Sequence, residues 1–336
     1  MPRVSVVVPS WNTRGFLRAC LASLSRQSFR DFEVVVVDSG STDGSVEMVE
    51  QDFPEARVVA LGENRGFSGA ANAGIEATDS ELVALLNSDT EQDVGWLSAL
   101  VAASDAHPEA GMFASRMLSL HDRRVLDGAG DALRASGLPY RVGHGEVDRG
   151  QYSVKRYVFG ACAAAALYRR RMLEDVGLFD EDFFAYCEDG DLSFRAQLAG
   201  YRCLYVPDAV VYHAGGASSG GGRSPTATRL GTRNSILLLV KDLPAPLVPA
   251  ILPAFLAGQM LRLATSAATG TLPAHLAGLS EVPAMVPAML RKRRRVQKLR
   301  RVEVEYVERL LEASSREARR SLLRRAKDRV LPRIGG

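Results

Sequence analysis

The sequence has few cysteines and lacks the motifs that mark the commonest nucleotide-binding and zinc-binding proteins. Its four cysteines, Cys20, Cys162, Cys187 and Cys203, lie far apart and form no CxxC pair. This spacing predicts reduced thiols and argues against a zinc site. No GxGxxG fingerprint follows the first predicted strand and no GxxxxGK(S/T) loop is present, which disfavours a dehydrogenase and an ordinary nucleoside triphosphatase. No signal peptide precedes that strand, so we expect a cytoplasmic protein.

Charge is unevenly distributed along the 336 residues. Residues 291–336 carry 17 Lys/Arg against 6 Asp/Glu, a net charge of +11, whereas residues 1–290 carry 25 against 33, a net charge of −8. A basic tail on a mildly acidic body predicts a polyanionic partner, either a membrane surface or nucleic acid. The length is sufficient for one large α/β domain with an appendage, or for two domains.

Short apolar runs alternate with helical patterns through the first 90 residues. We expect strands at residues 4–8, 32–37, 56–61 and 82–86, with helices beginning near residues 14, 45 and 66. Runs of consecutive aliphatic residues are typical of strands buried on both faces. Because the connections are short, we expect a largely parallel sheet covered by helices on both faces.

Three of these strands end in candidate binding groups: Pro9, Asp38 and Asp89. In an open α/β sheet, ligands bind in the crevice beyond the carboxyl ends of the strands. The three positions together therefore predict a ligand crevice at one edge of the sheet. Structural roles are the alternative, since Asp38 could stabilise its own turn and Asp89 could cap the helix expected after Asp93.

Four segments, taken together, resemble family 2 of the glycosyltransferases, and most of all its rhamnosyltransferase branch. They are VVVPSWN at residues 6–12, VVDSGSTDGS at 36–45, NRGFSGAANAG at 64–74 and LLNSDT at 85–90, and the resemblance extends over residues 3–240. It implies an inverting enzyme with the α/β nucleotide-diphospho-sugar transferase fold (GT-A, Rossmann-like). We expect this fold to be followed by a mainly helical C-terminal appendage.

The resemblance also suggests how the chain is divided. Residues 1–115 would form a nucleotide-sugar-binding half and residues 116–240 the acceptor-binding half of the same catalytic domain. Residues 241–290 would be an apolar, proline-rich segment at the membrane interface, and residues 291–336 a basic helical tail.

The same resemblance implies a set of donor-binding residues. Asp38 is suited to accept the N3–H of a uracil or thymine ring. Arg65 could pair with a phosphate or simply lie on the surface, and Gly66 and Gly69 would let the backbone approach the nucleotide closely. The other donor-binding candidates are Pro9, Asn64, Asn72, Asn87 and Ser88.

Asp89 is implied as the ligand of a Mg²⁺ or Mn²⁺ ion that bridges the donor diphosphate. The family pattern makes His213 a second ligand, and imidazole suits Mn²⁺ better than Mg²⁺; a lone histidine is otherwise a structural hydrogen-bonding group. The first acidic position of the Asp-x-Asp motif of the wider fold is Asn87 here. This neutral amide lowers the charge of the ligand set and leaves the identity of the metal open.

Asp189 is implied as the catalytic base, and Glu188 as the residue that orients it or contacts the acceptor. An inverting transfer is accelerated by a carboxylate that takes the proton of the attacking hydroxyl. Two adjacent acids also raise each other's pKa, which would suit a base that works near neutral pH. The alternative is that Glu188, Asp189 and Asp191 complement a helix dipole, with Asp191 paired to Arg195 one turn later.

The C-terminal third suggests contact with a membrane. Residues 243–290 contain two Lys/Arg/Asp/Glu residues and seven prolines. Residues 243–261 carry no charge and are long enough for a span, but their four prolines argue against a regular helix. We expect short helices in the membrane interface; an inserted hairpin and packing against the body are the alternatives.

Residues 291–301 add eight basic side chains in eleven residues. An apolar segment beside a basic cluster is typical of attachment to anionic lipid. Nucleic-acid binding would require a recognised module, and none is visible. Beyond the cluster, Val307, Leu310, Leu311, Ala318 and Leu322 repeat at helical spacing, which predicts a C-terminal helix.

These observations predict a metal-dependent inverting glycosyltransferase of cell-envelope glycan synthesis. It would move a sugar, with rhamnose as a candidate, from a UDP- or dTDP-linked donor to a lipid-linked or polysaccharide acceptor at the cytoplasmic face of the membrane. A catalytically silent membrane scaffold is the alternative, encouraged by Asn87 alone. A nucleotidyltransferase would normally show a glycine-rich, basic loop after the first strand, which residues 9–13 are not.

Overall fold

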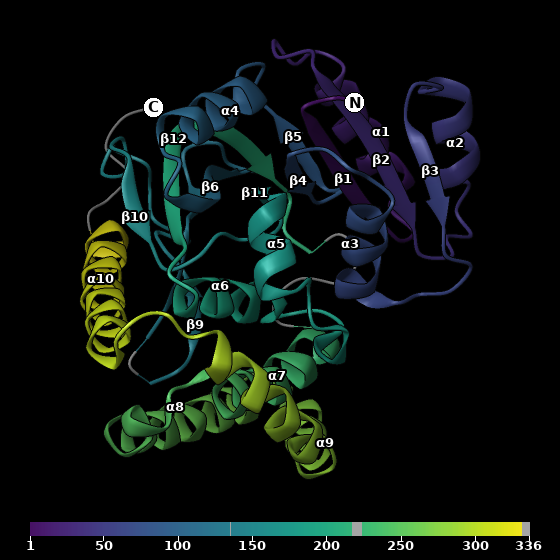
Figure 1. The fold of residues 1–336 in the computed structure, drawn as a ribbon. Coiled ribbons are helices and arrows are strands. Elements are labelled where there is room, and N and C mark those ends of the chain that lie inside the picture. The colour runs from purple at the N-terminus through teal and green to yellow at the C-terminus, as the bar shows by residue number, and fades with distance from the viewer. Residues whose placement is uncertain (135, 217–223, 331–336) are drawn as a thin grey trace.

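The computed structural model describes residues 1–134, 136–216 and 224–330 (Figure 1). The strands are β1 (Val4–Ser10), β2 (Phe32–Asp38), β3 (Arg57–Ala60), β4 (Leu82–Leu86), β5 (Thr90–Gln92), β6 (Ala110–Ser119), β7 (Leu126–Ala129), β8 (Asp131–Leu133), β9 (Pro139–Arg141), β10 (Arg156–Val158), β11 (Ala165–Arg169) and β12 (Arg202–His213). The α-helices are α1 (Arg14–Leu24), α2 (Ser45–Asp52), α3 (Gly66–Glu76), α4 (Trp96–Ala106), α5 (Arg170–Val176), α6 (Glu188–Leu198), α7 (Pro225–Asp242), α8 (Val248–Ala268), α9 (Leu272–Leu299) and α10 (Val304–Val330).

Within the described residues, ten strands form one mixed sheet. Its order is β10-β12-β6-β11-β4-β1-β2-β3, with β5 added to β12 and β7 added to β6. The strands β3, β2, β1 and β4 run parallel, as expected from their connecting helices. The other half is not parallel throughout, because β11 runs antiparallel to both β4 and β6. A short loop joins β6 to β7, and such a connection allows their antiparallel pairing. The partners of β11, in contrast, are strands far from it in the sequence.

The parallel half is buried on both faces, as the continuous aliphatic runs predicted. Val6 and Val8 of β1 pack on one side of the sheet with Leu17 of α1. Val7 points to the opposite side and packs with Ile75 of α3. Successive side chains of a strand point to opposite faces, so a strand in the middle of a covered sheet needs apolar residues at every position.

The chain after β4 does not enter a helix directly. Strand β5 follows Asp89, and α4 begins only at Trp96. The Oδ1 atom of Asp93 accepts a hydrogen bond of 3.1 Å from the Gly95 backbone amide at the start of α4. The alternative role of Asp89 as a helix cap is therefore wrong.

The C-terminal third consists of long helices, and the expectation of short ones is wrong. Helices α8 and α9 contain 21 and 28 residues. Pro244 and Pro246 precede α8, and Pro249 lies in its first turn, where a helix does not need the backbone N–H. Pro253 lies inside α8, which continues past it to Ala268. Helices α7, α8 and α9 lie below α6 in Figure 1. By length and composition alone, the segment Ala245–Ala268 could cross a membrane, and it is the one such segment in the described chain.

Helix α10 packs back onto the sheet domain instead of extending into solvent. The Tyr140 hydroxyl donates a 2.7 Å hydrogen bond to the Ser314 carbonyl, and the Arg324 guanidinium lies 2.8 Å from the Glu146 carboxylate. Val307 and Leu311 are buried as their spacing predicted, whereas Leu322 is exposed. The basic tail is thus held by β9 and by the segment that follows it.

Candidate active site

A cavity of about 760 Å³ opens where β4 and β12 end. Strand β4 leads into Asn87 and Asp89, and His213 is the last residue of β12. The cavity is also lined by side chains from the β7–β9 region, from the residues before β11, from α6 and from α8. Its charged and histidine lining residues are Asp89, Asp127, Asp131, Arg134, Arg141, His144, Glu188, Asp189, His213 and Arg262. The candidate metal ligands and the candidate base therefore face the same space.

Asp89 and His213 form a buried pair at one side of the cavity. The Nε2 atom of His213 lies 3.3 Å from Oδ1 of Asp89 and 3.5 Å from Nδ2 of Asn87. The pairing of β5 with β12 places Thr90 opposite His213 and so carries Asp89 to the histidine. One carboxylate oxygen and one imidazole nitrogen converge here, a donor set that fits Mn²⁺ and leaves further positions for oxygen ligands.

Asp127 of β7 completes this pair, and the sequence analysis missed it. Its Oδ2 atom lies 2.7 Å from Nδ1 of His213 and 2.5 Å from Nη1 of Arg141. Burial alone would raise the pKa of Asp127, but the charges and hydrogen bonds of Arg141, His144 and His213 hold it well below its usual range. The only signal in the sequence is a carboxylate inside a short strand of small and apolar residues. Such a partner orients a metal-binding histidine through its second nitrogen.

The protonation of His213 is coupled to this arrangement. Burial lowers the pKa of His213, but the hydrogen bonds and charges of Asp127 and Asp89 more than offset it and raise the pKa to about 9. Only the neutral imidazole can bind a metal. A divalent ion at Asp89 and His213 must therefore displace a proton, and its binding should strengthen as the pH rises towards 9.

A second group of acids lies at the start of α6. Ligand atoms of Asp189, Asp131 and Cys162 lie within 4.8 Å of one another, close enough to share a proton or a cation. Burial and the charge of Asp189 raise the pKa values of Glu188 and Asp131 well above their usual range, so the neutral carboxyl is favoured at both. The expected effect of adjacent acids is thus confirmed for Glu188. Asp131 and Cys162 were missed by the sequence analysis.

The three acids at the start of α6 divide into two functions. Asp191 is fully buried; its Oδ2 atom lies 2.8 Å from Arg195, the predicted partner, and its Oδ1 atom 2.5 Å from Lys241 of α7. Glu188 and Asp189 instead line the cavity, and Oε2 of Glu188 has no hydrogen-bond partner among the described residues. Asp191 is therefore structural, while its two neighbours are available to a ligand.

The segment before α6 has an unusual backbone. Phe184, Tyr186 and Cys187 have φ values of 64°, 68° and 69°, a left-handed conformation that side chains disfavour. The Asn234 amide of α7 donates hydrogen bonds of 2.7–2.9 Å to three carbonyls of this segment. The surrounding structure thus holds a strained turn that delivers Asp189 to the cavity.

Four predicted donor-binding residues contact this same region or one another. Arg65 forms a 2.8 Å ion pair with Glu181, and the Asn72 amide donates to Glu181 at 3.1 Å. A side chain at Gly66 would collide with the carbonyl of Phe184. The Asn64 side-chain oxygen accepts from the Gly66 amide at 2.9 Å. These contacts attach α3 to the turn before α6. The nucleotide-binding roles of Asn64, Arg65, Gly66 and Asn72 stay predictions.

Of the remaining donor-binding candidates, Asn87 lines the large cavity, whereas Pro9, Asp38 and Ser88 lie at the ends of β1, β2 and β4, outside its lining. The Oδ2 atom of Asp38 accepts hydrogen bonds from two amides of its own turn, at 3.0 and 2.9 Å, as the structural alternative predicted. Its Oδ1 atom is buried and has no hydrogen-bond partner in the described chain. The Ser88 hydroxyl accepts from Thr13 at 2.9 Å. Pro9 lies in β1, next to β2, where Ser10 is paired with Asp38.

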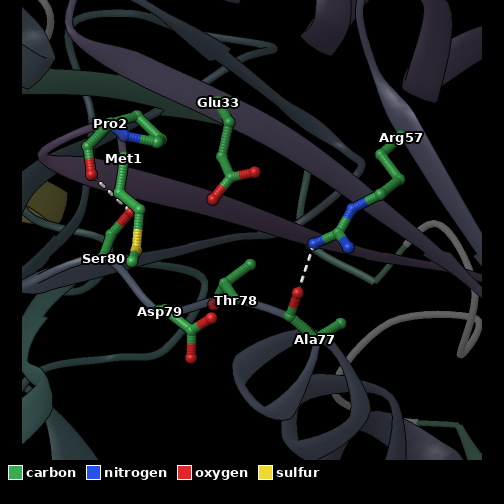
Figure 2. Close-up of a pocket in the computed structure, with 8 residues that line it drawn as sticks. All are labelled: Met1, Pro2, Glu33, Arg57, Ala77, Thr78, Asp79 and Ser80. Carbon is green, nitrogen blue, oxygen red and sulfur yellow. Dashed lines mark hydrogen bonds between the residues drawn. The ribbon is translucent and has the colours of Figure 1, made fainter.

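A second pocket, of about 210 Å³, lies at the opposite edge of the sheet (Figure 2). It is formed by the residues just before β1 and β4 and by Glu33 and Arg57 near the starts of β2 and β3. The Arg57 guanidinium bonds to the Ala77 carbonyl, and the Ser80 hydroxyl donates to the Pro2 carbonyl at 2.7 Å (Figure 2). Ligands of open α/β sheets bind at the carboxyl edge, so we assign no function to this pocket.

Comparison with known proteins places this geometry in context. Residues 5–177 match the family described as glycosyl transferase family 2. The N-acetylglucosaminyl-diphospho-decaprenol L-rhamnosyltransferase of Mycobacterium tuberculosis is 29% identical over 261 residues, which cover 70% of this chain and 83% of that protein. The pre-mycofactocin glycosyltransferase of the same organism is 32% identical over 247 residues, which cover 67% of this chain and 48% of that protein.

Solved structures with low sequence identity share the fold. The mannosyltransferase PcManGT from Pyrobaculum calidifontis, in complex with GDP-Man and Mn²⁺, matches with a TM-score of 0.55 and 20% identity over 99% of this chain and 88% of its own. S. aureus TarS 1–349 in complex with UDP-GlcNAc matches with a TM-score of 0.57 and 19% identity over 95% and 92%. The predicted GT-A fold with a helical C-terminal region is confirmed.

Proposed function

The chain belongs to glycosyl transferase family 2, and from this premise we propose that it transfers a sugar, with inversion, from a pyrimidine nucleotide-diphosphate donor to a lipid-linked or polysaccharide acceptor of the cell envelope. The observation that carries the proposal is the convergence of two groups in one cavity. The Asp89–His213 pair offers metal ligands, and Asp189 offers a carboxylate to accept a proton.

We propose that Asp89 and His213 bind a divalent ion, Mn²⁺ or Mg²⁺. When bound, such an ion neutralises charge that develops on the departing nucleotide diphosphate. The complex of the mannosyltransferase with GDP-Man and Mn²⁺ supports a metal in this fold. Asn87 is a neutral amide and adds no negative charge to this site. The carboxylate of Asp127 accepts a hydrogen bond from Nδ1 of His213 and so orients the imidazole.

On the donor side, the unpartnered Oδ1 atom of Asp38 is suited to accept the N3–H of uracil or thymine. The UDP-GlcNAc complex of the TarS structure supports a uridine nucleotide, and the rhamnosyltransferase relative supports rhamnose as the sugar. The name of that relative also describes an acceptor linked through diphosphate to a lipid. On the acceptor side, Asp189 removes the proton of the attacking hydroxyl.

A panel of nucleotides should reveal the donor class. We expect UDP or dTDP to raise the melting temperature of the protein in the presence of Mn²⁺ and much less in EDTA, because a ligand that binds only the folded state stabilises it by mass action. CDP, whose cytosine N3 carries no hydrogen, should have little effect. Differential scanning fluorimetry at several nucleotide concentrations would measure the shift.

Asp38→Ala provides the matched control, since it removes the proposed base contact and leaves the metal pair intact. The rise in melting temperature caused by UDP or dTDP should be mostly lost in the Asp38→Ala protein. If no nucleotide stabilises the wild-type protein under any metal condition, the scaffold alternative replaces the enzyme.

We also propose that α8 and α9 lie on an anionic membrane surface. Val248, Leu252, Leu256 and Met260 recur every four residues along one side of α8, and the last two are 54% and 64% exposed. Residues four apart lie on the same face of a helix. Figure 1 places α8 and α9 at the end of the molecule away from the sheet.

The exposed side chains of α9 are mostly apolar in the first part of the helix and basic in its last part. Its exposed residues are Pro273, Leu276, Ser280, Pro283, Ala284, Pro287 and Leu290, followed by Arg291, Arg294, Arg295 and Lys298. These four basic side chains form no ion pair within the described chain, so their charge is available to lipid phosphates. Exposed apolar area beside a basic cluster gives the two contributions that stable attachment to a membrane requires.

Replacement of Leu256 and Met260 by glutamate should reduce binding to vesicles of phosphatidylglycerol and phosphatidylcholine by about tenfold or more, since two buried leucine-sized side chains contribute about 3 kcal/mol. Co-sedimentation would measure the bound fraction. Val154→Glu is the control, because Val154 is 73% exposed but lies just before β10 of the sheet. Equal binding by wild type and double variant would contradict this orientation.

A further inference from the structure

Two arginines that line the cavity have no acidic partner in the part of the chain that the structure describes. Arg141 pairs with Asp127, but neither Arg134 nor Arg262 forms an ion pair with a carboxylate in the described part of the chain. Buried or half-buried charges in proteins are usually paired. An unpaired guanidinium at the wall of a binding cavity is therefore expected to meet an anion of the ligand.

Arg262 projects from α8 and is held by hydroxyl groups. Its Nη1 atom donates to the Ser235 hydroxyl at 3.0 Å, and its Nη2 atom lies 3.5 Å from the Thr232 hydroxyl. Burial lowers the pKa of Arg262, and no carboxylate offsets this effect. The hydroxyls orient the side chain without neutralising it, which leaves its charge for a ligand.

Arg134 lies in the turn that joins β8 to β9. Its Nε atom is buried without a hydrogen-bond partner among the described residues, and its guanidinium lies 5.0 Å from the ring centre of Tyr140. The same turn packs on α8, because a Cβ atom added at Gly258 would lie 2.8 Å from Leu138. Gly258 and Arg262 are one turn apart and share a face of the helix. Both arginines thus belong to the part of the cavity formed by α8 and this turn.

The cavity wall also includes apolar side chains. Ala132, Leu138, Pro139 and Phe159 line the cavity together with the two arginines. The acids of the cavity come instead from the loop after β4, from β7 and β8 and from the start of α6. The opposite side of α8 carries the exposed apolar row that we place on the membrane. A ligand that fits this part of the cavity carries negative charge and an apolar chain.

We propose that Arg134 and Arg262 form an anion subsite that binds the phosphate groups of a lipid-linked acceptor. The inference deepens the proposed function and rests on it. The lipid chain would leave the cavity beside α8 towards the membrane, and the acceptor sugar would extend towards Asp189. Arginine is suited to this task because its planar fork binds phosphate through two parallel hydrogen bonds.

Farnesyl diphosphate, farnesol and inorganic pyrophosphate are suitable probes, and thermal stabilisation in EDTA measures their binding without a metal-held nucleotide. We expect farnesyl diphosphate to stabilise the wild-type protein and farnesol to have little effect. Arg134→Gln and Arg262→Gln should each weaken binding of farnesyl diphosphate at least about tenfold, as for loss of a charged hydrogen bond. Arg262→Lys should weaken farnesyl diphosphate binding less than Arg262→Gln does, because lysine keeps the positive charge.

The control is nucleotide binding by the same variants. Binding of UDP or dTDP with Mn²⁺ should be unchanged; an equal loss would assign the arginines to the donor diphosphate instead. Pyrophosphate binding as tight as that of farnesyl diphosphate would identify a free-phosphate site and overturn the lipid assignment. The proposed subsite would be overturned if the folded variants bound farnesyl diphosphate as tightly as the wild type. It would also be overturned if the wild-type protein did not bind farnesyl diphosphate. If farnesyl diphosphate bound in an arginine-dependent way but no nucleotide bound, the proposed function would be overturned and the anion subsite would stand.

Discussion

Replacement of Asp189 by asparagine is expected to lower the rate of sugar transfer by about 10²–10⁴-fold, the range typical of general base catalysis. The amide has nearly the same shape as the carboxylate but cannot accept a proton from the acceptor hydroxyl. The candidate metal ligands and Asp38 are untouched, so nucleotide affinity should not change. Release of nucleotide diphosphate in the presence of acceptor would measure the rate, and thermal stabilisation would measure the affinity.

Glu188→Gln is the informative control for this prediction. Burial and the charge of Asp189 raise the pKa of Glu188 well above its usual range, so glutamine replaces a carboxyl that is already favoured in its neutral form. The loss of rate should therefore be much smaller than for Asp189→Asn. A normal rate in the folded Asp189→Asn protein would contradict the assignment of the base, and a larger loss for Glu188→Gln would move the role to Glu188.

Replacement of Asp89 by asparagine should have a comparably large effect, about 10²–10³-fold on transfer, because a metal ion contributes several kcal/mol of charge stabilisation to such reactions. The change removes the negative ligand and, with Asn87 beside it, leaves two neutral amides next to His213. Stimulation of activity by Mn²⁺ should be lost. Titration of activity with Mn²⁺ and with Mg²⁺ would measure both the loss and the metal preference.

Asp127→Asn provides a graded comparison with Asp89→Asn. Asp127 accepts a hydrogen bond from Nδ1 of His213 at 2.7 Å, so it would orient this proposed ligand and not bind the ion itself. Loss of such an orienting partner typically weakens metal binding about 10–100-fold without abolishing it. Metal-stimulated transfer in the Asp89→Asn protein equal to that of the wild type would exclude Asp89 as a ligand.

Local patterns were sufficient for the parallel half of the sheet. The aliphatic runs of β1, β2 and β4 and the helical spacing of Leu17, Cys20 and Leu21 in α1 depend on nearest neighbours and on burial. The antiparallel insertion of β11 could not be predicted in this way, because the direction of a strand depends on where its distant partners lie. The same limit applies to α8, which is helical throughout although Pro253 lies inside it, so the number of prolines in a segment does not decide whether a helix forms.

The candidate site shows a similar division. Asp89, Glu188, Asp189 and His213 stand in recognisable local motifs, and the structure brings them to one cavity. Arg65 and Gly66 also stand in such a motif, yet their contacts are to the segment before α6. Their sequence pattern indicates that these residue types are required, but it does not indicate which neighbouring residues they contact.

By itself, the sequence determined the family resemblance, the parallel half of the sheet, the acids and histidine at the ends of strands and helices, and the unequal distribution of charge. Only the tertiary structure decided which charges are neutralised. It pairs Asp191 with Arg195 and Lys241, brings Asp127 to His213, and gives Arg134 and Arg262 no acid among the described residues. The physical reason is that burial and electrostatic pairing depend on distances between residues far apart in the chain, which no local pattern contains.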